Sequence, residues 1–431
     1  MEITRQIIKN PSPSQWLALA ARPVADLADI EQKVAPILQD VKAHGDAALR
    51  KYARRFDKVE MQHFGAGSDE IDSAAADLPD ELKEAIAVAA ANIEKFHAAQ
   101  LEQRLEVETA PGVVCWRKSV PIRKVGFYIP GGTAPLFSTV LMLGIPARIA
   151  GCTEVLLCTP PSSEGNVHPA ILYSANLLGI RRVFKIGGAQ AIAAMAYGTE
   201  SIPRVDKIFG PGNQYVTAAK QLVSKEGIAI DMPAGPTELA VLTDASCRPE
   251  FVAADLLSQA EHGTDSQVVL VSTDEAGIDA IHREITRQIA RLPRKEIAAQ
   301  ALAHSRSILF ENLEVALEFI NAYAPEHLII ATDDARKWAE KVENAGSVFV
   351  GHYAPESAGD YASGTNHTLP TNGFARAFSG VSVDSFCKKI TFQQLTEAGL
   401  RNIGRAIEVL AEAEELHGHK RAVSVRLQSR D

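Results

Sequence analysis

The chain has 431 residues and a formal net charge of -9 at pH 7. A single hydrophobic core stops growing at roughly 250–300 residues, so this length predicts at least two domains. Hydrophobic residues make up 46% of the sequence and charged residues 23%, which is typical of a soluble globular protein. The negative charge gives no general attraction to nucleic acid or anionic membranes, so we expect neither as a partner.

The N-terminal segment MEITRQIIKN has a glutamate at position two and no apolar core, so it has the features of neither a secretory signal nor an anchor. No apolar run reaches the roughly 18 residues that a membrane-spanning helix needs. The five cysteines are an odd number without a CxxC pair, which favours reduced thiols over disulfides or a thiolate zinc site. These features predict a soluble, cytoplasmic protein.

The first hundred residues have the apolar spacing of helices. Apolar residues recur at intervals of three and four between Val34 and Val41, and again between Leu82 and Ile93. Gly45 breaks the first of these runs. The N-terminal region is therefore predicted to be helical.

From Lys124 onwards, short apolar strands alternate with amphipathic helical segments. The predicted strands of this series are 125–129, 154–158, 182–186 and 207–209. A second series begins near Leu239 and contains LAVLT, QVVLVS, SILF, HLIIAT and SVFV. Each strand is followed by a loop and a helical stretch, which is the βαβ order of a mostly parallel sheet. We expect two doubly wound, incomplete Rossmann-like α/β domains with helical N-terminal and C-terminal segments.

The tail after Asp384 differs from both series. Its pattern predicts an almost continuous helix from Thr391 to Leu416 and no further strands. A helical tail without a strand to join either sheet has to pack on something else.

Four separated segments concentrate side chains that bind metals or move protons. They are SQAEHG at 258–263, APEHL at 324–328, SAGDYASGTNHTLPT at 357–371 and ELHGH at 415–419. Gln259 and His262 stand three apart, so a helix from Phe251 to His262 would place both on one face. Asp360 adds a carboxylate and His419 a second imidazole. Nitrogen and oxygen ligands without a thiolate favour zinc or another first-row divalent cation.

These segments, in this order, resemble the histidinol dehydrogenase family. The resemblance runs from the N-terminal helices to HGHKRAVSVR, through GFYIPGGTAPL, IGGAQAIAAMAYGT, FGPGNQYV and DMPAGPTE. It implies a zinc-containing, NAD-dependent dehydrogenase that oxidises L-histidinol through L-histidinal to L-histidine, the last steps of histidine biosynthesis. It also implies a homodimer whose active sites are shared between the subunits.

The resemblance assigns roles to particular residues. For zinc it implies Gln259, His262, Asp360 and His419. For the substrate it implies Thr237, Gln259, His262, His327, Asp360, Glu414 and His419, and His367 is expected to line the same pocket. For NAD it implies Tyr128, Gln190 and Asn213, and for catalysis Glu326 and His327. His417, two residues before His419, is the alternative metal ligand.

Glu326 and His327 are adjacent, and adjacent side chains of a regular strand point to opposite faces. We therefore predict that they share a pocket on a turn, which Pro325 supplies because proline is favoured at the first position of a helical turn. By resemblance, His327 is the base for the alcohol and the hydrated aldehyde, and Glu326 activates the water that adds to the aldehyde.

The resemblance also implies a division into domains. It gives an N-terminal arm at 1–22, a first α/β domain at 23–127 and 237–383 with the metal and catalytic residues, a second α/β domain at 128–236 on the NAD side, and a tail at 384–431 that reaches the partner subunit's site. No GxGxxG motif follows a strand, so the usual dinucleotide fingerprint is absent. Glycine-rich loops at 131–132, 187–188 and 210–212 follow strands instead; in the alternative interpretation they are only tight turns.

The ligand types alone leave other functions open. A zinc hydrolase could use Glu326 as its general base, but this would give the second α/β domain no role. A non-catalytic metal-binding or amino-acid-binding protein would not need an acid–base pair beside the ligands. A cysteine nucleophile acting on the aldehyde is a further alternative.

Overall fold

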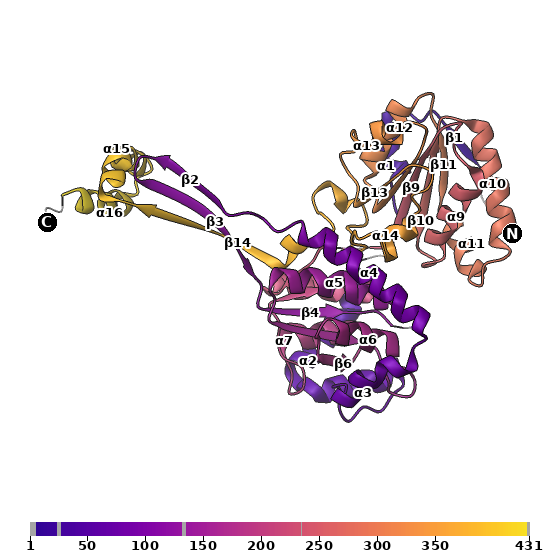
Figure 1. Ribbon diagram of the computed structural model, residues 1–431, viewed down its shortest axis with the longest axis horizontal. Helices are drawn as coiled ribbons and strands as arrows, with labels where there is room; N and C mark the ends of the chain where they lie inside the picture. Colours follow the sequence, from indigo (N-terminus) through magenta and orange to yellow (C-terminus); the bar gives the residue numbers. More distant parts are fainter. Residues whose placement is uncertain (1–5, 24–26, 132–134, 234, 429–431) are drawn as a thin grey trace.

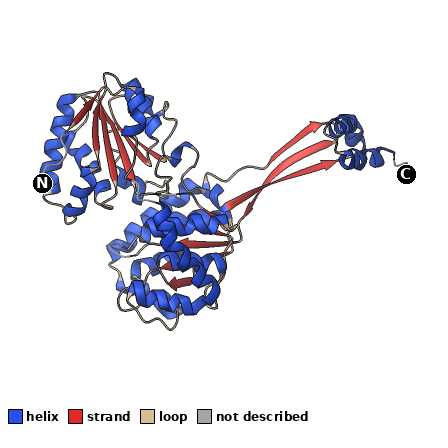
Figure 2. Ribbon diagram, turned by 180° about the vertical axis from the view of Figure 1, so that it is seen from behind, coloured by secondary structure: helices blue, strands red, loops and turns tan. Residues whose placement is uncertain are grey.

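The structure is a computed structural model that describes residues 6–23, 27–131, 135–233 and 235–428. Figures 1 and 2 show two α/β bodies side by side and a long arm that extends away from both. The arm consists of residues 105–121 and 387–428, and the C-terminal helices lie at its tip. The last residue of the sequence lies outside the described ranges.

The first body contains a six-stranded parallel sheet in the order β1-β11-β10-β9-β12-β13. Its strands are β1 (Ile7–Lys9), β9 (Glu238–Thr243), β10 (Gln267–Ser272), β11 (Arg306–Leu309), β12 (His327–Ala331) and β13 (Ser347–Val350). Strands β9, β10 and β12 are buried along their whole length. Such strands are apolar on both faces because helices cover both sides of a parallel sheet.

Two hydrophobic cores lie on opposite faces of this sheet. Leu239 and Val241 face one core, and Ala240 and Leu242 face the other, as the alternation of strand side chains requires. The first core is closed by α9 (Pro249–Ala260), α10 (Glu275–Ile289) and α11 (Lys295–Ala303). The second is closed by α1 (Pro13–Leu19), α12 (Leu313–Tyr323) and α13 (Ala335–Ala339). Helix α14 (Glu356–Tyr361) follows β13.

The second body contains a five-stranded parallel sheet in the order β6-β5-β4-β7-β8. Its strands are β4 (Lys124–Tyr128), β5 (Glu154–Thr159), β6 (Arg182–Lys185), β7 (Lys207–Phe209) and β8 (Ala229–Ile230). One face is covered by α2 (Leu27–Tyr52), α7 (Gly188–Tyr197) and α8 (Gln214–Lys225). The other is covered by α3 (Ser68–Ser73), α5 (Phe137–Ala150) and α6 (Pro169–Leu177). The prediction of two doubly wound α/β units is confirmed.

The N-terminal helices pack differently from the grouping of 23–127 with 237–383 that the resemblance implied. Helix α2 shares a core with α7 and α8 of the five-stranded sheet, through buried residues such as Val34 and Leu38. Helix α4 (Asp80–Ala98) packs on α5 of the same body. An apolar stripe shows which face a helix buries but not which sheet covers it. The predicted break at Gly45 is present, since its φ of 50° interrupts α2.

The tail is not the continuous helix that its pattern predicted. Residues Cys387–Leu395 form a strand, β14, that pairs antiparallel with β3 (Val113–Pro121), and β2 (Leu105–Ala110) completes a third sheet. The rings of Phe392 and Trp116 stack across this pairing, with centroids 5.2 Å apart. Helices α15 (Glu397–Ala413) and α16 (His417–Gln428) follow. The strand was missed because its pairing partner lies far away in the sequence, whereas helix periodicity is a local signal.

Two further features bear on the expectations from composition. No helix within the described ranges is both long and apolar enough to cross a bilayer. All five cysteines are free thiols. Burial raises the pKa of Cys152 to about 12 and that of Cys247 to about 11, so these thiols carry little of the thiolate that a nucleophile needs.

A half-buried carboxylate shortly after α2 predicts a pH-dependent stability. Asp57 closes a π-helical turn at Ala53–Asp57, and its Oδ2 is buried without a hydrogen-bond partner. Burial raises the pKa of Asp57 from 3.8 to about 6. The folded chain therefore holds this proton more tightly than the unfolded chain, and the free energy of unfolding falls as the pH rises from about 4 to about 6.

We expect Asp57→Asn to be more stable than the parent by about 1–2 kcal/mol above pH 7, after allowing for partial exposure, and to lose this advantage near pH 4. Urea unfolding at pH 4.5 and pH 8 checks this result. An equal difference between variant and parent at both pH values would show that Asp57 does not titrate as described.

Candidate functional site

The candidate site lies at the amino ends of β9 and β12. These strands are neighbours where the strand order of the six-stranded sheet reverses, since β10 and β11 lie on one side and β13 on the other. Glu238 begins β9 directly after Thr237, and His327 begins β12 directly after Glu326. Doubly wound sheets usually bind ligands at the carboxyl ends of their strands, so this edge is unexpected.

The carboxylate of Glu326 is held by two donors from the start of β9. Its Oε2 accepts from Thr237 Oγ1 at 2.6 Å and from the Glu238 main-chain N–H at 3.0 Å. Burial raises the pKa of Glu326 well above its ordinary value, and the two hydrogen bonds offset this only in part. Glu326 is therefore a strong base once it is ionised.

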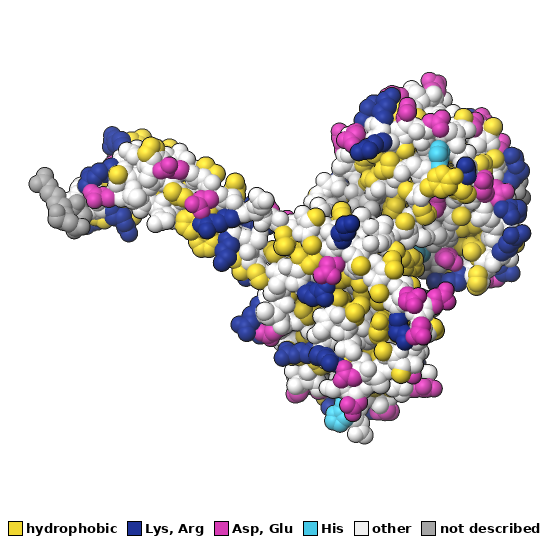
Figure 3. All heavy atoms as spheres, viewed as in Figure 1, with side chains coloured by type: hydrophobic (Ala, Val, Ile, Leu, Met, Phe, Trp, Pro, Cys, Tyr) yellow, Lys and Arg dark blue, Asp and Glu magenta, His cyan; other side chains and the backbone are white. Residues whose placement is uncertain are grey.

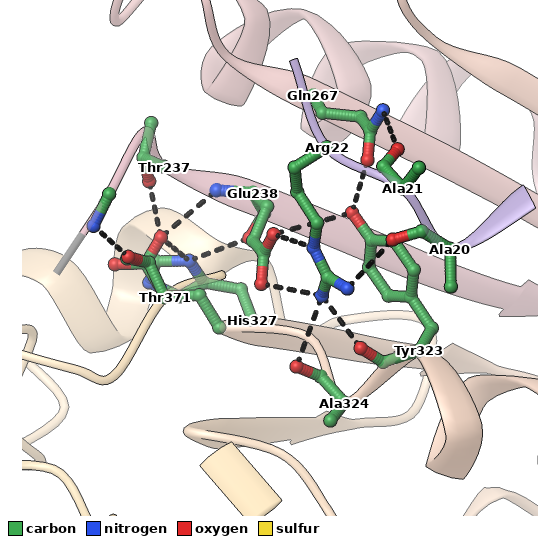
Figure 4. Close-up of polar contacts among 12 residues, drawn as sticks. Ala20, Ala21, Arg22, Thr237, Glu238, Gln267, Tyr323, Ala324, His327 and Thr371 are labelled. Carbon is green, nitrogen blue, oxygen red and sulfur yellow. Dashed lines mark hydrogen bonds and ion pairs between the residues drawn. The ribbon is translucent and has the colours of Figure 1, made fainter. Parts of the chain in front are cut away.

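One nitrogen of the His327 imidazole is hydrogen-bonded, and the other has no hydrogen-bond partner. Its Nδ1 lies 3.3 Å from the main-chain oxygen of Glu238, a pure acceptor, so Nδ1 carries the proton (Figure 4). Its Nε2 is buried without a hydrogen-bond partner and lies 3.7 Å from Asp360 Oδ1. Burial lowers the pKa of His327 to about 3, so the ring is neutral and Nε2 can accept a proton.

No helical turn begins at Pro325, contrary to the prediction. The left-handed conformation that ends α12 is at Ala324, with a φ of 53°. The chain bends at Glu326, but the main-chain oxygens of Pro325 and Glu326 already accept from Gly346 and Ser347, so the pairing with the segment of β13 begins before His327. Glu326 and His327 share a pocket because both side chains contact the main chain of residue 238.

His262, Glu356 and Asp360 form a cluster that could hold a metal ion. One ligand atom from each lies within 4.8 Å of the others. Glu356 and Asp360 stand one turn apart on α14, which approaches β13 closely because a Cβ on Gly359 would meet the Phe349 ring at 2.6 Å. Glu356 was missed by sequence reasoning, although its spacing of four from Asp360 was visible.

Gln259 completes this cluster, because its side-chain amide lies between Thr237 and Glu356. When Nε2 donates to Thr237 Oγ1, the amide oxygen faces the Glu356 carboxylate, and two such acceptors need either a proton on Glu356 or a cation between them. With the amide turned over, Nε2 donates to Glu356 and the oxygen accepts from Thr237 and Glu238. The second orientation satisfies the hydrogen bonds of the amide, so the fit to a divalent cation rests on the oxygen and nitrogen donors of the cluster as a whole.

Four carboxyl groups crowd this site. Burial raises the pKa of Asp360 and that of Asp255 to about 7. Burial also raises the pKa of Glu356, and the nearby charges of Asp360, Glu326 and Asp255 add to the effect. A pocket built in this way resists ionisation on its own, and it favours cationic ligands.

His367 connects the site to the second body. Its Nδ1 lies 2.9 Å from the main-chain oxygen of Asp360, and its Nε2 lies 3.0 Å from Thr139 Oγ1 in the first turn of α5. The adjacent Asn366 donates to the main-chain oxygen of Met142 at 2.6 Å. The candidate site is therefore at the junction of the two α/β bodies, and His367 is part of it.

The residues predicted from the tail are not brought to this site. Glu414, His417 and His419 are exposed and lie at the tip of the arm, far from the six-stranded sheet of the same chain (Figure 1). Glu415 between the two helices has a φ of 58°, which separates α15 from α16.

The three residues predicted for NAD lie at the carboxyl edge of the five-stranded sheet. Tyr128 ends β4, Gln190 is in the first turn of α7 after β6, and Asn213 caps α8 after β7. The Tyr128 hydroxyl accepts from Gly188 N–H at 3.1 Å, and Asn213 Oδ1 accepts from two amides of α8. Strands β4 and β7 flank the reversal of strand order, where such sheets open a crevice. Gly132 of the first glycine loop lies outside the described residues.

Comparison with known proteins gives a family for the chain. Residues 20–427 match the family model of histidinol dehydrogenase. A histidinol dehydrogenase of Bacteroides thetaiotaomicron is 58% identical over 422 residues, which cover 98% of this chain and 99% of the relative. One from Xanthomonas euvesicatoria is 54% identical over 408 residues, covering 94% and 95%. The crystal structure of histidinol dehydrogenase from Elizabethkingia anophelis has a TM-score of 0.96 and 56% identity, and 98% of each chain is covered. The chain therefore belongs to the histidinol dehydrogenase family of oxidoreductases.

Proposed function

We propose that this protein oxidises L-histidinol through L-histidinal to L-histidine with two NAD+, as the last steps of histidine biosynthesis. The observation that carries the proposal is the convergence of Glu326 and His327 on residue 238, beside a cluster of metal-type side chains. Membership of the family supports the assignment of L-histidinol as the substrate. The metal would bind at the amino ends of β9 and β12 in the six-stranded sheet, and the cofactor at the carboxyl edge of the five-stranded sheet.

Zinc is the proposed metal, and Gln259, His262 and Asp360 would hold it together with His419 of the partner subunit. Nitrogen and oxygen donors without sulfur suit this ion. Glu356 lies within the same cluster and would either bind the ion or orient Gln259. When bound, zinc would hold and orient the amino and imidazole nitrogens of the substrate. The crowded carboxyl groups favour both the ion and a cationic substrate.

His327 is the proposed base of both oxidations. Its free Nε2 accepts the hydroxyl proton as carbon gives up its hydride, and its Nδ1–H stays on the Glu238 oxygen. That carbonyl stabilises the imidazolium formed in this step, because a protonated ring donates from both nitrogens. NAD+, when bound, accepts the hydride, and Tyr128, Gln190 and Asn213 would contact it. Asp360, Thr237 and His367 would line the substrate pocket, with Glu414 of the partner subunit.

Glu326 is the proposed base for the water that adds to the aldehyde. Only the second oxidation consumes water, so Glu326→Gln is expected to slow the oxidation of L-histidinal by about 100-fold and that of L-histidinol by less than about tenfold. His327→Ala is expected to slow both by about 100-fold or more. Steady-state rates with each compound test the split. Equal losses on both substrates for Glu326→Gln would remove its assigned role.

The proposed assembly is a homodimer with shared active sites. The proposed location is the cytoplasm. The arm carries exposed apolar side chains along its sheet and on its helices (Figure 3). They are Leu105, Val107, Ile390, Phe392, Leu395, Val409, Leu410, Leu416 and Val425. A thin arm with this much exposed apolar surface is expected to be covered by a partner. Such an arm could bring His419 to the other subunit's site.

The reaction class is tested by the appearance of NADH when the zinc-loaded protein receives NAD+ and L-histidinol. Sustained NADH fluorescence, with L-histidine as product, is the expected result. A zinc hydrolase or a binding protein would use the same ligands but would form no NADH. The His327→Ala variant, loaded and assayed in parallel, shows whether any signal comes from a contaminating dehydrogenase.

A further inference from the structure

Arg22 forms a buried ion pair with Glu238 directly behind the candidate site (Figure 4). Its Nε donates to Glu238 Oε2 at 2.6 Å and its Nη2 to Glu238 Oε1 at 2.9 Å. The two side chains are only 6% and 1% exposed. The guanidinium also lies over the ring of Tyr323, with 3.8 Å between its carbon and the ring centroid. This two-point geometry fixes the Glu238 side chain in one orientation.

Arg22 also donates hydrogen bonds to main-chain oxygens. Nη1 donates to Ala20 at 2.9 Å, and Nη2 also donates to Tyr323 at 2.6 Å. The hydroxyl of Tyr323 in turn donates to Gln267 at 2.8 Å. The guanidinium is thus engaged inside the fold and joins the N-terminal segment, β9 and the end of α12. It is not turned towards a substrate.

The main chain of Glu238 faces the other way and holds both proposed catalytic residues. Its N–H donates to Glu326 Oε2 at 3.0 Å, and its carbonyl accepts from His327 Nδ1 at 3.3 Å. These two contacts set the direction of the carboxylate and the tautomer that leaves Nε2 free. A rotation of residue 238 would loosen both at once, since one residue provides them.

We propose that the Arg22–Glu238 ion pair is a positioning device for the catalytic pair. It fixes residue 238 from behind, and through the main chain of that residue it orients Glu326 and maintains the Nδ1–H tautomer of His327. The assignment rests on the proposed function for the roles of Glu326 and His327. The tautomer itself does not depend on any reaction, so it can be measured separately.

Two variants of Arg22 test the proposal in the zinc-loaded protein. Arg22→Met removes the charge. Arg22→Lys keeps the charge but replaces the two-point contact of the guanidinium by that of a single ammonium group. We expect single-turnover hydride transfer to slow by about 10- to 100-fold in Arg22→Met and by a smaller factor in Arg22→Lys. The dissociation constants of zinc and L-histidinol, measured by calorimetry, should stay within about twofold of the parent, because Arg22 touches neither proposed ligand.

The tautomer is read by ¹⁵N NMR of protein labelled at its histidine rings, with His327→Gln used to assign the signal. The parent should show a protonated Nδ1 and an unprotonated Nε2, and Arg22→Met a mixture of both forms. Leu317→Ala, a cavity variant in α12 of the same body, is the control for lost stability alone. It should unfold more easily but keep the parent's rate and tautomer.

If Arg22→Met does not fold, Arg22→Lys decides the question. A parent rate and a parent tautomer in Arg22→Lys, or an equal slowing in Leu317→Ala, would overturn the proposal. If the parent protein forms no NADH at all, the proposed function fails, while the NMR comparison still tests the role of Arg22.

Discussion

Removing the metal is expected to lower the turnover of L-histidinol by about 100-fold or more while leaving the fold intact. Without the proposed zinc ion the substrate would lose the group that holds and orients it, and misplacement of a reactant alone costs about 100-fold. The fold survives because the proposed ligands lie at the edge of the six-stranded sheet, outside its two hydrophobic cores. With its amide oxygen and nitrogen exchanged, Gln259 donates to Glu356, so its hydrogen bonds do not depend on the ion.

The measurement compares chelator-treated protein with the same sample after zinc is returned. Circular dichroism should not change between them, and turnover should recover in proportion to bound zinc. A matched sample treated with chelator and excess zinc together controls for damage by the chelator. Full activity in protein verified to be free of metal would contradict the zinc assignment.

A mixture of His262→Ala and His419→Ala chains is expected to recover activity that neither variant has alone. His262 lies at the sheet and His419 at the tip of the arm, so a shared site takes one from each subunit. In a mixed dimer, one site carries both defects and the other receives an intact residue from each chain. If subunits pair at random, co-refolded protein should recover roughly a quarter of the parent's activity under two-fold symmetry.

Both variants refolded separately and then combined without exchange provide the control, and they should stay nearly inactive. Mass spectrometry of the co-refolded sample verifies that mixed dimers are present. No recovery in such a sample would mean that the arm does not supply His419 to the other subunit. The same experiment with His417→Ala in place of His419→Ala distinguishes the two candidate ligands.

The two parallel sheets were predictable from sequence because their strands are short apolar runs between glycine or proline loops. The buried run LAVLT, for example, became β9 with its side chains divided between two cores. Strand β14 was not predictable in the same way, since it is stabilised by β3 from a distant part of the chain. The packing of α2 on the five-stranded sheet likewise depends on tertiary contacts that an amphipathic pattern does not specify.

For the site, spacing predicted that Gln259 and His262 lie together, and the resemblance added Asp360 and His419. The structure places the first three around one cluster, whereas His419 of the same chain lies on the distant arm. Glu356 escaped notice because its spacing of four from Asp360, although visible in the sequence, is not distinctive by itself. Residue 238 could not be assigned to the site from sequence, since it contacts Glu326 and His327 through its main chain. The position of the site at the amino ends of the strands was also unexpected. Strand order and loop contacts determine this position, and a local sequence motif specifies neither.

The most direct test of the central claim is the number of NADH molecules formed for each L-histidinol consumed by the zinc-loaded protein. Substrate is supplied in limiting amount with excess NAD+, and NADH and L-histidine are quantified at completion. Two successive oxidations at one site predict a ratio of two, with L-histidine as the sole product. A ratio of one with accumulated L-histidinal, or consumption of L-histidinol without NADH, would contradict the four-electron oxidation proposed for this protein.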